Sequence, residues 1–302
     1  MKCTKCGGRA VIDLKRHNSG FCKEHFLEYF DGQVRKAIDD FAMFEPEDRI
    51  LVAVSGGKDS LVLWDALLRF GYQADGLYID LGIPDYAPAS TAKVDAFLEH
   101  RPEAVLRRVS LSDDHGYAIP EAARRLRRAA CSPCGLSKRY IFNREALQGG
   151  YDVVCTGHNL DDEAAVLFGN MIRWQVGYLG RQYPVLEERD GGLIRKVKPL
   201  IRVTEKETAA YAVLTGIDYM VEECPMAAGA RSLLYKDLLN QLEARSPGSK
   251  QQFLWGFFEH GQPAFEEQEG AELTPCSECG QPTSRPGRCA FCRMTESLTA
   301  PA

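Results

Sequence analysis

The 302-residue sequence lacks any apolar run that approaches the ~18–20 residues of a membrane-spanning helix. Its first residues, MKCTKCGG, lack the apolar segment of a signal peptide. Internal repeats and low-complexity tracts are also missing. These absences predict a cytoplasmic protein that does not associate with membranes. In that compartment, eleven cysteines indicate metal or redox sites rather than structural disulfides.

An excess of positive charge is missing as well, because the net charge is −5 and the pI is about 5.8. The composition therefore does not indicate a nucleic-acid-binding protein, although local basic patches decide such binding. Binding to RNA would require the basic side chains to share one face. The candidates, besides the lysines of the two chain ends, are Arg124, Arg125, Arg127, Arg128, Lys196, Lys198 and Arg202.

The chain divides by its cysteine content into residues 1–30, 31–265 and 272–296. The middle part alternates apolar strand patterns with helical patterns. The expected strands are 49–55, 74–82, 104–111, 151–158 and 196–200. Alternation of this kind predicts an α/β fold with a doubly wound parallel sheet, which binds ligands at the carboxyl ends of its strands. Small cysteine-rich modules are expected to flank this Rossmann-like core.

A phosphate-binding loop is expected at AVSGGKDS, between the first strand and a helix. Gly56 and Gly57 let backbone N–H groups approach an anion, and the helix N-terminus adds partial positive charge. Lys58 adds a full positive charge, and two serine hydroxyls add donors. The predicted binding segment is Ala53, Val54, Ser55, Gly56, Gly57, Lys58, Asp59 and Ser60.

SGGKDS resembles the PP-loop signature of ATP pyrophosphatases, which cut ATP between its α and β phosphates. The resemblance implies that Asp59 and Asp162 lie near the triphosphate and its Mg²⁺, an ion that prefers oxygen ligands. It further implies that Ile79 lies beside the adenine and that a backbone turn at Gly157 meets the nucleotide.

Two sets of cysteine pairs have the spacing of zinc sites. Zinc prefers four nitrogen or sulfur ligands in a closed tetrahedron, and such sites hold small modules together. Near the N-terminus the expected ligands are Cys3, Cys6, Cys22 and His25, with His17 as a rival for the fourth place. Near the C-terminus they are Cys276, Cys279, Cys289 and Cys292.

Four cysteines remain. Cys155 lies in an apolar strand pattern and is expected to be a buried core residue. Cys131 and Cys134 form a CxxC pair, and Cys224 is a distant third thiol before a proline. Three cysteines without a nearby histidine suit a [4Fe–4S] cluster with one open iron better than structural zinc. Transfer of sulfur through a persulfide on the same cysteines is an open alternative.

The combination of SGGKDS, CSPCGLSKR, TGHNLDDEA, a later ECP and zinc-like modules at both ends resembles the TtuA/TtcA group of tRNA 2-thiolation enzymes. The two end modules favour the TtuA side, the tRNA 2-thiouridine synthetases. The resemblance implies that a uridine O2 attacks the α-phosphate of ATP, and that a sulfur held on the open iron then replaces the activated oxygen.

The same resemblance implies tRNA, a thiocarboxylated ubiquitin-like sulfur carrier and a second copy of the chain as partners. It implies thiolation at position 54 in the T-loop, with the wobble position 34 as the alternative. Lys138 is then expected to reach phosphate or developing charge, and Arg139 is a second candidate. Two other rivals are a PP-loop ligase acting on a small molecule and a zinc-ribbon RNA-binding module without ATP turnover.

Overall fold

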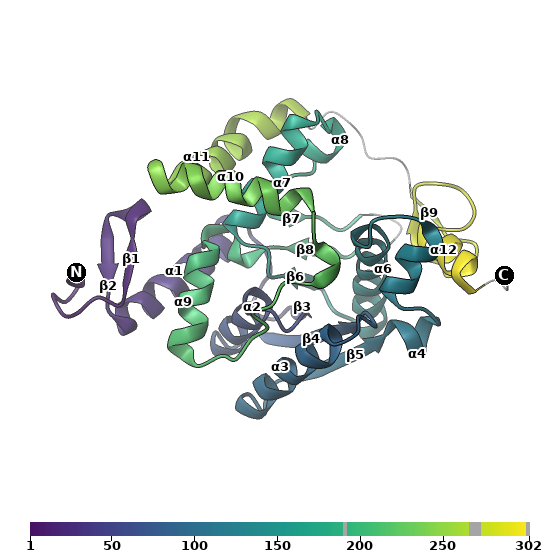
Figure 1. Cartoon of the computed structure of the whole chain (residues 1–302), viewed down its shortest axis with the longest axis horizontal. Helices are drawn as coiled ribbons and strands as arrows, with labels where there is room; N and C mark the ends of the chain where they lie inside the picture. Colours follow the sequence, from purple (N-terminus) through teal and green to yellow (C-terminus); the bar gives the residue numbers. More distant parts are fainter. Residues whose placement is uncertain (190–191, 266–272, 300–302) are drawn as a thin grey trace.

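The chain folds into an α/β core with a small cysteine-rich module at each end of its long axis (Figure 1). The structure, a computed structural model, describes residues 1–189, 192–265 and 273–299. Among the helices in these ranges, none combines the length and the apolar composition needed to cross a membrane.

The core sheet has six strands in the order β5-β4-β3-β6-β8-β7. Its strands are β3 (Arg49–Val54), β4 (Gln73–Asp80), β5 (Leu106–Ser110), β6 (Val153–Thr156), β7 (Val185–Leu186) and β8 (Arg195–Val197). Every neighbouring pair is parallel except β7 and β8. The predicted doubly wound parallel sheet is therefore confirmed, with an added antiparallel edge strand that the sequence pattern does not indicate.

Helices cover this sheet and join its strands. They are α1 (Lys23–Asp40), α2 (Lys58–Arg69), α3 (Tyr86–His100), α4 (Leu111–His115), α5 (Ile119–Leu126), α6 (Cys131–Gly149), α7 (Leu160–Ile172), α8 (Val176–Leu179), α9 (Glu205–Thr215), α10 (Arg231–Arg245), α11 (Ser249–Gly256) and α12 (Ala290–Thr299). Short helical turns are η1 (Lys15–His17), η2 (Pro199–Arg202), η3 (Pro225–Ala227), η4 (Phe257–Gly261) and η5 (Gln262–Phe265). The end modules contribute the hairpins β1 (Ile12–Leu14) with β2 (Ser19–Phe21) and β9 (Thr274–Pro275) with β10 (Pro282–Thr283).

Both faces of the sheet are buried, as its continuous apolar strands predict. Successive side chains of a strand point to opposite faces. Ile50 and Val52 belong to one core cluster, which includes Trp64 of α2, whereas Leu51 belongs to a second cluster, which includes Ile141 of α6. Two separate cores thus hold helices on either side of β3.

The strand order reverses between β3 and β6. The chain runs from β3 outward to β5, then returns to β6 on the other side of β3 and continues to β8. Sheets of this kind bind ligands in the crevice outside the carboxyl ends of the strands at such a reversal. The loop after β3 is the predicted phosphate-binding loop, so the fold brings that loop to the expected place.

The N-terminal module is joined to the core by a buried ion pair. Arg16 and Glu207 approach to 2.7 Å with side chains that are 6% and 0% exposed. Arg16 also donates to Tyr29 Oη at 3.0 Å. Glu207 also closes a capping box with Thr204 at the start of α9. The helix α1 continues without a break across the predicted domain boundary at residue 30.

Candidate active site

The loop after β3 is held in a sharp turn that requires glycine. Gly56 has a φ of +76°, and a Cβ at this position would lie 2.7 Å from the backbone oxygen of Ser90. The Ser55 N–H donates to Ser60 Oγ at 3.1 Å, and that hydroxyl donates to the Gly57 carbonyl at 2.9 Å. These bonds fix the loop where α2 begins, with its N-terminal N–H groups available to an anion.

The loop between β6 and α7 packs directly on the phosphate-binding loop. A Cβ on Gly157 would come within 2.9 Å of backbone atoms of Asp59 and Ser60, so only glycine fits there. Asn159 follows and caps α7 by accepting from two backbone N–H groups. Its side-chain amide donates to Asp59 Oδ1 at 3.0 Å. The two predicted loops therefore meet at one edge of the sheet.

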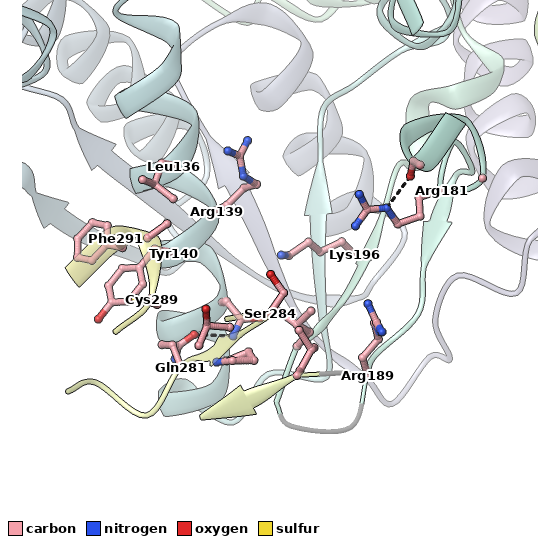
Figure 2. A pocket seen from close by; sticks show the side chains of 18 of the residues that line it. Leu136, Arg139, Tyr140, Arg181, Arg189, Lys196, Gln281, Ser284, Cys289 and Phe291 are labelled. Atoms are coloured by element: carbon pink, nitrogen blue, oxygen red, sulfur yellow. Dashed lines mark hydrogen bonds between the residues drawn. The ribbon is translucent and has the colours of Figure 1, made fainter. Parts of the chain in front are cut away.

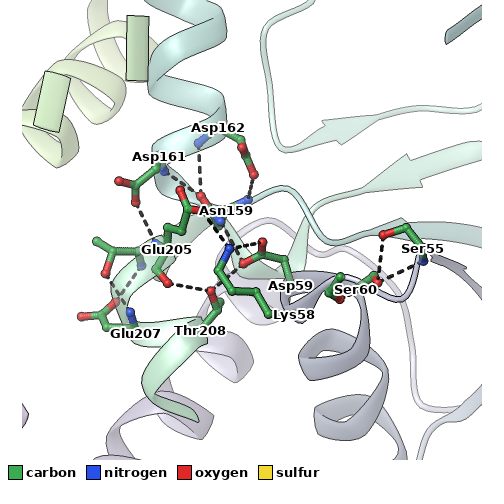
Figure 3. Close-up of polar contacts among 12 residues, drawn as sticks. Ser55, Lys58, Asp59, Ser60, Asn159, Asp161, Asp162, Glu205, Glu207 and Thr208 are labelled. Carbon is green, nitrogen blue, oxygen red and sulfur yellow. Dashed lines mark hydrogen bonds and ion pairs between the residues drawn. The ribbon is translucent and has the colours of Figure 1, made fainter. Parts of the chain in front are cut away.

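Charged side chains from α2, α7 and α9 gather above this edge (Figure 3), and Lys236 of α10 joins them in one network. Lys58 Nζ lies 3.0 Å from Asp59 Oδ2 and 2.8 Å from Glu205 Oε1. Lys236 of α10 reaches the same Glu205 at 3.1 Å and Asp162 at 2.6 Å. The network thus contains two ammonium groups, which can bind phosphate, and carboxylates, which can bind a divalent cation.

The charges of this network determine the protonation state of Glu205, the carboxylate at its centre. Burial of Glu205 opposes its ionisation, but the hydrogen bond from Lys58 and the charge of Lys236 outweigh burial and lower its pKa from 4.5 to about 2. Burial opposes the charge of Lys58, but Asp59 and Glu205 outweigh burial and raise the pKa of Lys58. Both partners therefore stay charged at neutral pH.

Acid is expected to lower the free energy of unfolding, in part through protonation of Glu205. A depressed carboxyl pKa contributes stability that is present above pH ~4.5 and is lost as the pH falls toward 2. Glu205→Gln is therefore expected to lower the free energy of unfolding at pH 7 and to flatten its decline between these pH values. Urea unfolding across that range measures the effect, with Glu47→Gln, at an exposed position, as the control. An unchanged pH profile for Glu205→Gln would contradict the assignment.

Cys131 and Cys134 occupy the first turn of α6, where the helix dipole favours thiolates. Cys224 lies directly before η3. The pKa of Cys134 is raised, mainly by its burial and further by the nearby Cys224 and Cys131. The charge of Lys138 opposes this effect. The structure therefore brings the three predicted cysteines and the predicted lysine into one electrostatic neighbourhood.

The sulfurs of these three cysteines are not packed as in a mononuclear site. Within the described residues, sets of ligand atoms that all lie within 4.8 Å of one another occur at the chain ends and not among these three cysteines. A single tetrahedral ion requires such close spacing. This wider arrangement of three thiols fits a multinuclear cluster better than one zinc ion.

The two end modules do have tetrahedral spacing. In the C-terminal module Cys276 and Cys292 have their Sγ atoms 3.9 Å apart, and Cys279 and Cys289 are 3.8 Å apart. Zn–S bonds of about 2.3 Å in a tetrahedron give roughly 3.8 Å between sulfurs, whereas a disulfide needs only about 2 Å. The predicted C-terminal ligands therefore fit one tetrahedral metal ion.

The N-terminal module gathers Cys3, Cys6, Cys22 and His25 in the same way. Cys22 Sγ lies 3.1 Å from His25 Nδ1, whereas the rival His17 bonds to Tyr29 Oη instead. Burial opposes ionisation of Cys3, but backbone N–H groups of neighbouring residues, that of Cys22 first, lower its pKa to about 6. This thiol is therefore a thiolate, the form that binds metal, at neutral pH.

The C-terminal module packs against the helix that carries the CxxC pair. Phe291 of α12 stacks on Tyr140 of α6 with ring centroids 3.7 Å apart. Gln281 accepts a hydrogen bond from Asn143 of α6 at 2.7 Å. The module therefore supports α6, whose first turn holds Cys131 and Cys134.

Comparison with known proteins finds this combination in one family. Residues 2–27 match the N-terminal LIM domain of the 2-thiouridine synthetase TtuA, and residues 28–239 match the PP-loop domain. A protein of Thermus thermophilus named tRNA-5-methyluridine(54) 2-sulfurtransferase is 48% identical over 99% of this chain and 92% of its own length. The chain belongs to the TtuA family of tRNA 2-sulfurtransferases.

Two further relatives agree with the TtuA-family assignment. A Thermotoga maritima protein with the same name is 41% identical over 99% of this chain and 97% of its own length. A solved structure of the U34-tRNA thiolase NcsA from Methanococcus maripaludis, with its [4Fe–4S] cluster, is 25% identical with a TM-score of 0.82. The alignment covers 100% of this chain and 98% of the NcsA chain. The resemblance inferred from the motifs is therefore confirmed.

Several of the predicted nucleotide residues of this TtuA-family chain have partners that the sequence did not indicate. Ile79 is 7% exposed in β4 and belongs to the second core cluster. The unpredicted partners come from elements distant in sequence. They are Asn159, Glu205, Thr208 and Lys236. Asn159 lies within the quoted TGHNLDDEA, whereas Lys236 has no local signal.

The predicted basic face is only partly available in this TtuA-family chain. Lys198 pairs with Glu163 at 2.7 Å, and Arg202 pairs with Asp40. Their charges are compensated within the fold, which leaves less positive charge for RNA at these two positions. The arginines of residues 124–128 are exposed just before Cys131.

Proposed function

We propose that this chain is an ATP-dependent enzyme that replaces O2 of a tRNA uridine by sulfur at position 54 in the T-loop. The observation that supports the proposal most strongly is its end-to-end similarity to relatives named for position 54, at 48% and 41% identity. The chain has a phosphate-binding loop, a charged network at that loop and a set of three cysteines with Lys138.

The first step is activation of the uridine. Its O2 attacks the α-phosphate of ATP, and the bond to the β-phosphate breaks so that pyrophosphate leaves. The α2 N-terminus and Lys58 bind the phosphates, while Asp59 and Asp162 would hold Mg²⁺. Lys58 must then exchange its contact with Glu205 for phosphate, and Lys236 stays paired with the carboxylates.

The second step replaces the activated oxygen. Sulfur forms a bond to C2, and the C2–O2 bond breaks so that AMP leaves with the oxygen. Cys131, Cys134 and Cys224 would hold a [4Fe–4S] cluster, which when bound supplies an iron without protein ligand as the place for the sulfur. Lys138 lies beside this set, where its charge stabilises the negative charge that develops. Arg139 follows it at an exposed position.

The other partners of the reaction belong to the same proposal. Each end module holds one Zn²⁺ in its four-ligand set. The sulfur comes from a thiocarboxylated ubiquitin-like carrier, for which the family resemblance is the support. A homodimer is supported by an apolar stripe on α10, where Leu234, Leu238 and Leu242 are exposed at a spacing of four residues.

Two alternatives keep the chemistry but change one component. The NcsA structure is named for U34, which supports the wobble position, at a lower identity of 25%. The three cysteines also permit transfer through a persulfide.

Nucleoside mass spectrometry tests the position directly. Deletion of the gene is expected to remove the 2-thiouridine of the T-loop fragment of digested tRNA and to leave the anticodon fragment unchanged. Restoration by the intact gene and not by a Cys224→Ser copy is the control. Loss of the wobble thionucleoside instead would contradict position 54.

A further inference from the structure

A cavity of about 880 Å³ lies between α6, β8 and the C-terminal module. Figure 2 shows Lys196 of β8 extending across it toward Arg139 of α6, with Arg181 and Arg189 on the opposite side. Ser284 contributes from the C-terminal module. The cavity therefore lies where the C-terminal module meets the α/β core, with which it shares one hydrophobic cluster.

The charged side chains described around this cavity are all positive. Among the described residues that line it, four are cationic and none is acidic. In the described part of the chain, neither Arg139 nor Lys196 has an ion-pair partner. Burial, followed by the charge of Arg139, lowers the pKa of Lys196. Arg139 is exposed and Lys196 is half-buried, and neighbouring cations without an acidic partner repel each other, so an anion in the cavity would be stabilised.

The cavity is also close to the proposed reaction site. Arg139 lies eight residues after Cys131 on the same helix, which is about 12 Å along the axis at 1.5 Å per residue. An anion bound here is therefore within reach of a substrate whose uridine is at the cysteines. The hydroxyls of Thr283 and Ser284 add neutral donors on the side of the C-terminal module.

We propose that this cavity binds backbone phosphates of the RNA substrate, so that the core and the C-terminal module hold the RNA together. The inference rests on the proposed function and adds to it the place of RNA contact. It gives the C-terminal module a binding role besides its support of α6. It also explains how a chain of net charge −5 attracts RNA, since the cations gather in one place.

Removal of single cations tests the proposal. Lys196→Gln and Arg181→Gln are each expected to weaken binding of the tRNA by about 3- to 10-fold. Each should also reduce the slope of log K against log salt by roughly 0.7 to 0.9, as expected when one phosphate contact is lost. Fluorescence anisotropy with labelled tRNA measures both quantities. Arg181 is exposed, so its variant keeps the test valid if Lys196→Gln fails to fold.

Adding a negative charge at Ser284 tests whether the C-terminal module contributes to RNA binding. Ser284→Glu is expected to weaken tRNA binding by on the order of 10-fold, whereas Ser284→Gln, of equal size, should bind as the wild type does. Lys36→Gln removes one charge from an exposed position on α1 and is the control for net charge. ATP affinity should be unchanged in all variants.

The outcomes separate this inference from the proposed function. Wild-type tRNA affinity and salt slope in the cavity variants, with intact thiolation, would overturn the cavity inference alone. Weaker binding of the sulfur carrier with unchanged tRNA binding would overturn it in favour of a protein ligand. Failure of the wild-type chain to bind or thiolate tRNA would overturn the proposed function itself.

Discussion

Replacement of Cys224 by serine is expected to lower tRNA thiolation by on the order of 1,000-fold or more, because residues that act as one unit lose the function together. Cys224 is the one ligand of the set that does not come from α6. A hydroxyl in its place removes a soft thiolate that iron–sulfur clusters require. Iron, sulfide and the visible spectrum of anaerobically purified protein measure the loss.

The same experiment has an internal and a matched control. The zinc content should stay at two ions per chain, because the end modules are separate from Cys224. Cys155→Ala also removes a thiol, but that thiol is fully buried in β6. It should keep iron and activity at some cost in stability. A wild-type enzyme that is free of iron and fully active would contradict the cluster and favour the persulfide route.

Replacement of Lys58 by alanine is expected to slow the ATP-dependent step by about 100- to 1,000-fold, the usual cost of removing one group that stabilises transition-state charge. Lys58 begins α2 and is the cation of the phosphate-binding loop. Its loss also leaves Asp59 and Glu205 without a shared partner. Release of pyrophosphate in the presence of tRNA measures the step.

Lys93→Ala is the matched control for Lys58→Ala. Lys93 pairs with Asp218 at the surface at 2.7 Å, so its loss should change neither ATP turnover nor thiolation. Thermal unfolding of both variants separates a folding defect from a catalytic one. Full activity of Lys58→Ala would contradict the proposed use of ATP and favour an RNA-binding module without turnover.

The sequence predicted the elements whose signals are local. The run from Arg49 to Val54 is apolar because both faces of β3 are buried, and this pattern made the strand evident. The end modules were evident because their metal ligands come in pairs that have two residues between them. β7 was missed because it has two residues at the edge of the sheet, too few for any periodicity.

The charged network was predicted only in part. Asp59 and Asp162 lie in recognisable motifs at the starts of α2 and α7, but Glu205 and Lys236 join them from α9 and α10. Such contacts depend on how helices pack across the sheet, which no short pattern encodes. Likewise, Lys198 and Arg202 looked available to RNA because the acidic partners that compensate them, Glu163 and Asp40, are distant in sequence.

The most direct test of the central claim is thiolation by the purified protein under anaerobic conditions, with ATP, a tRNA carrying uridine 54 and a sulfide source. Mass spectrometry of the digested tRNA and assays of AMP and pyrophosphate follow the reaction together. The expected result is one 2-thiouridine at position 54 for each AMP and each pyrophosphate released, and none without ATP. Thiolation that proceeds equally without ATP, or ATP cleavage that yields no thionucleoside, would contradict the account.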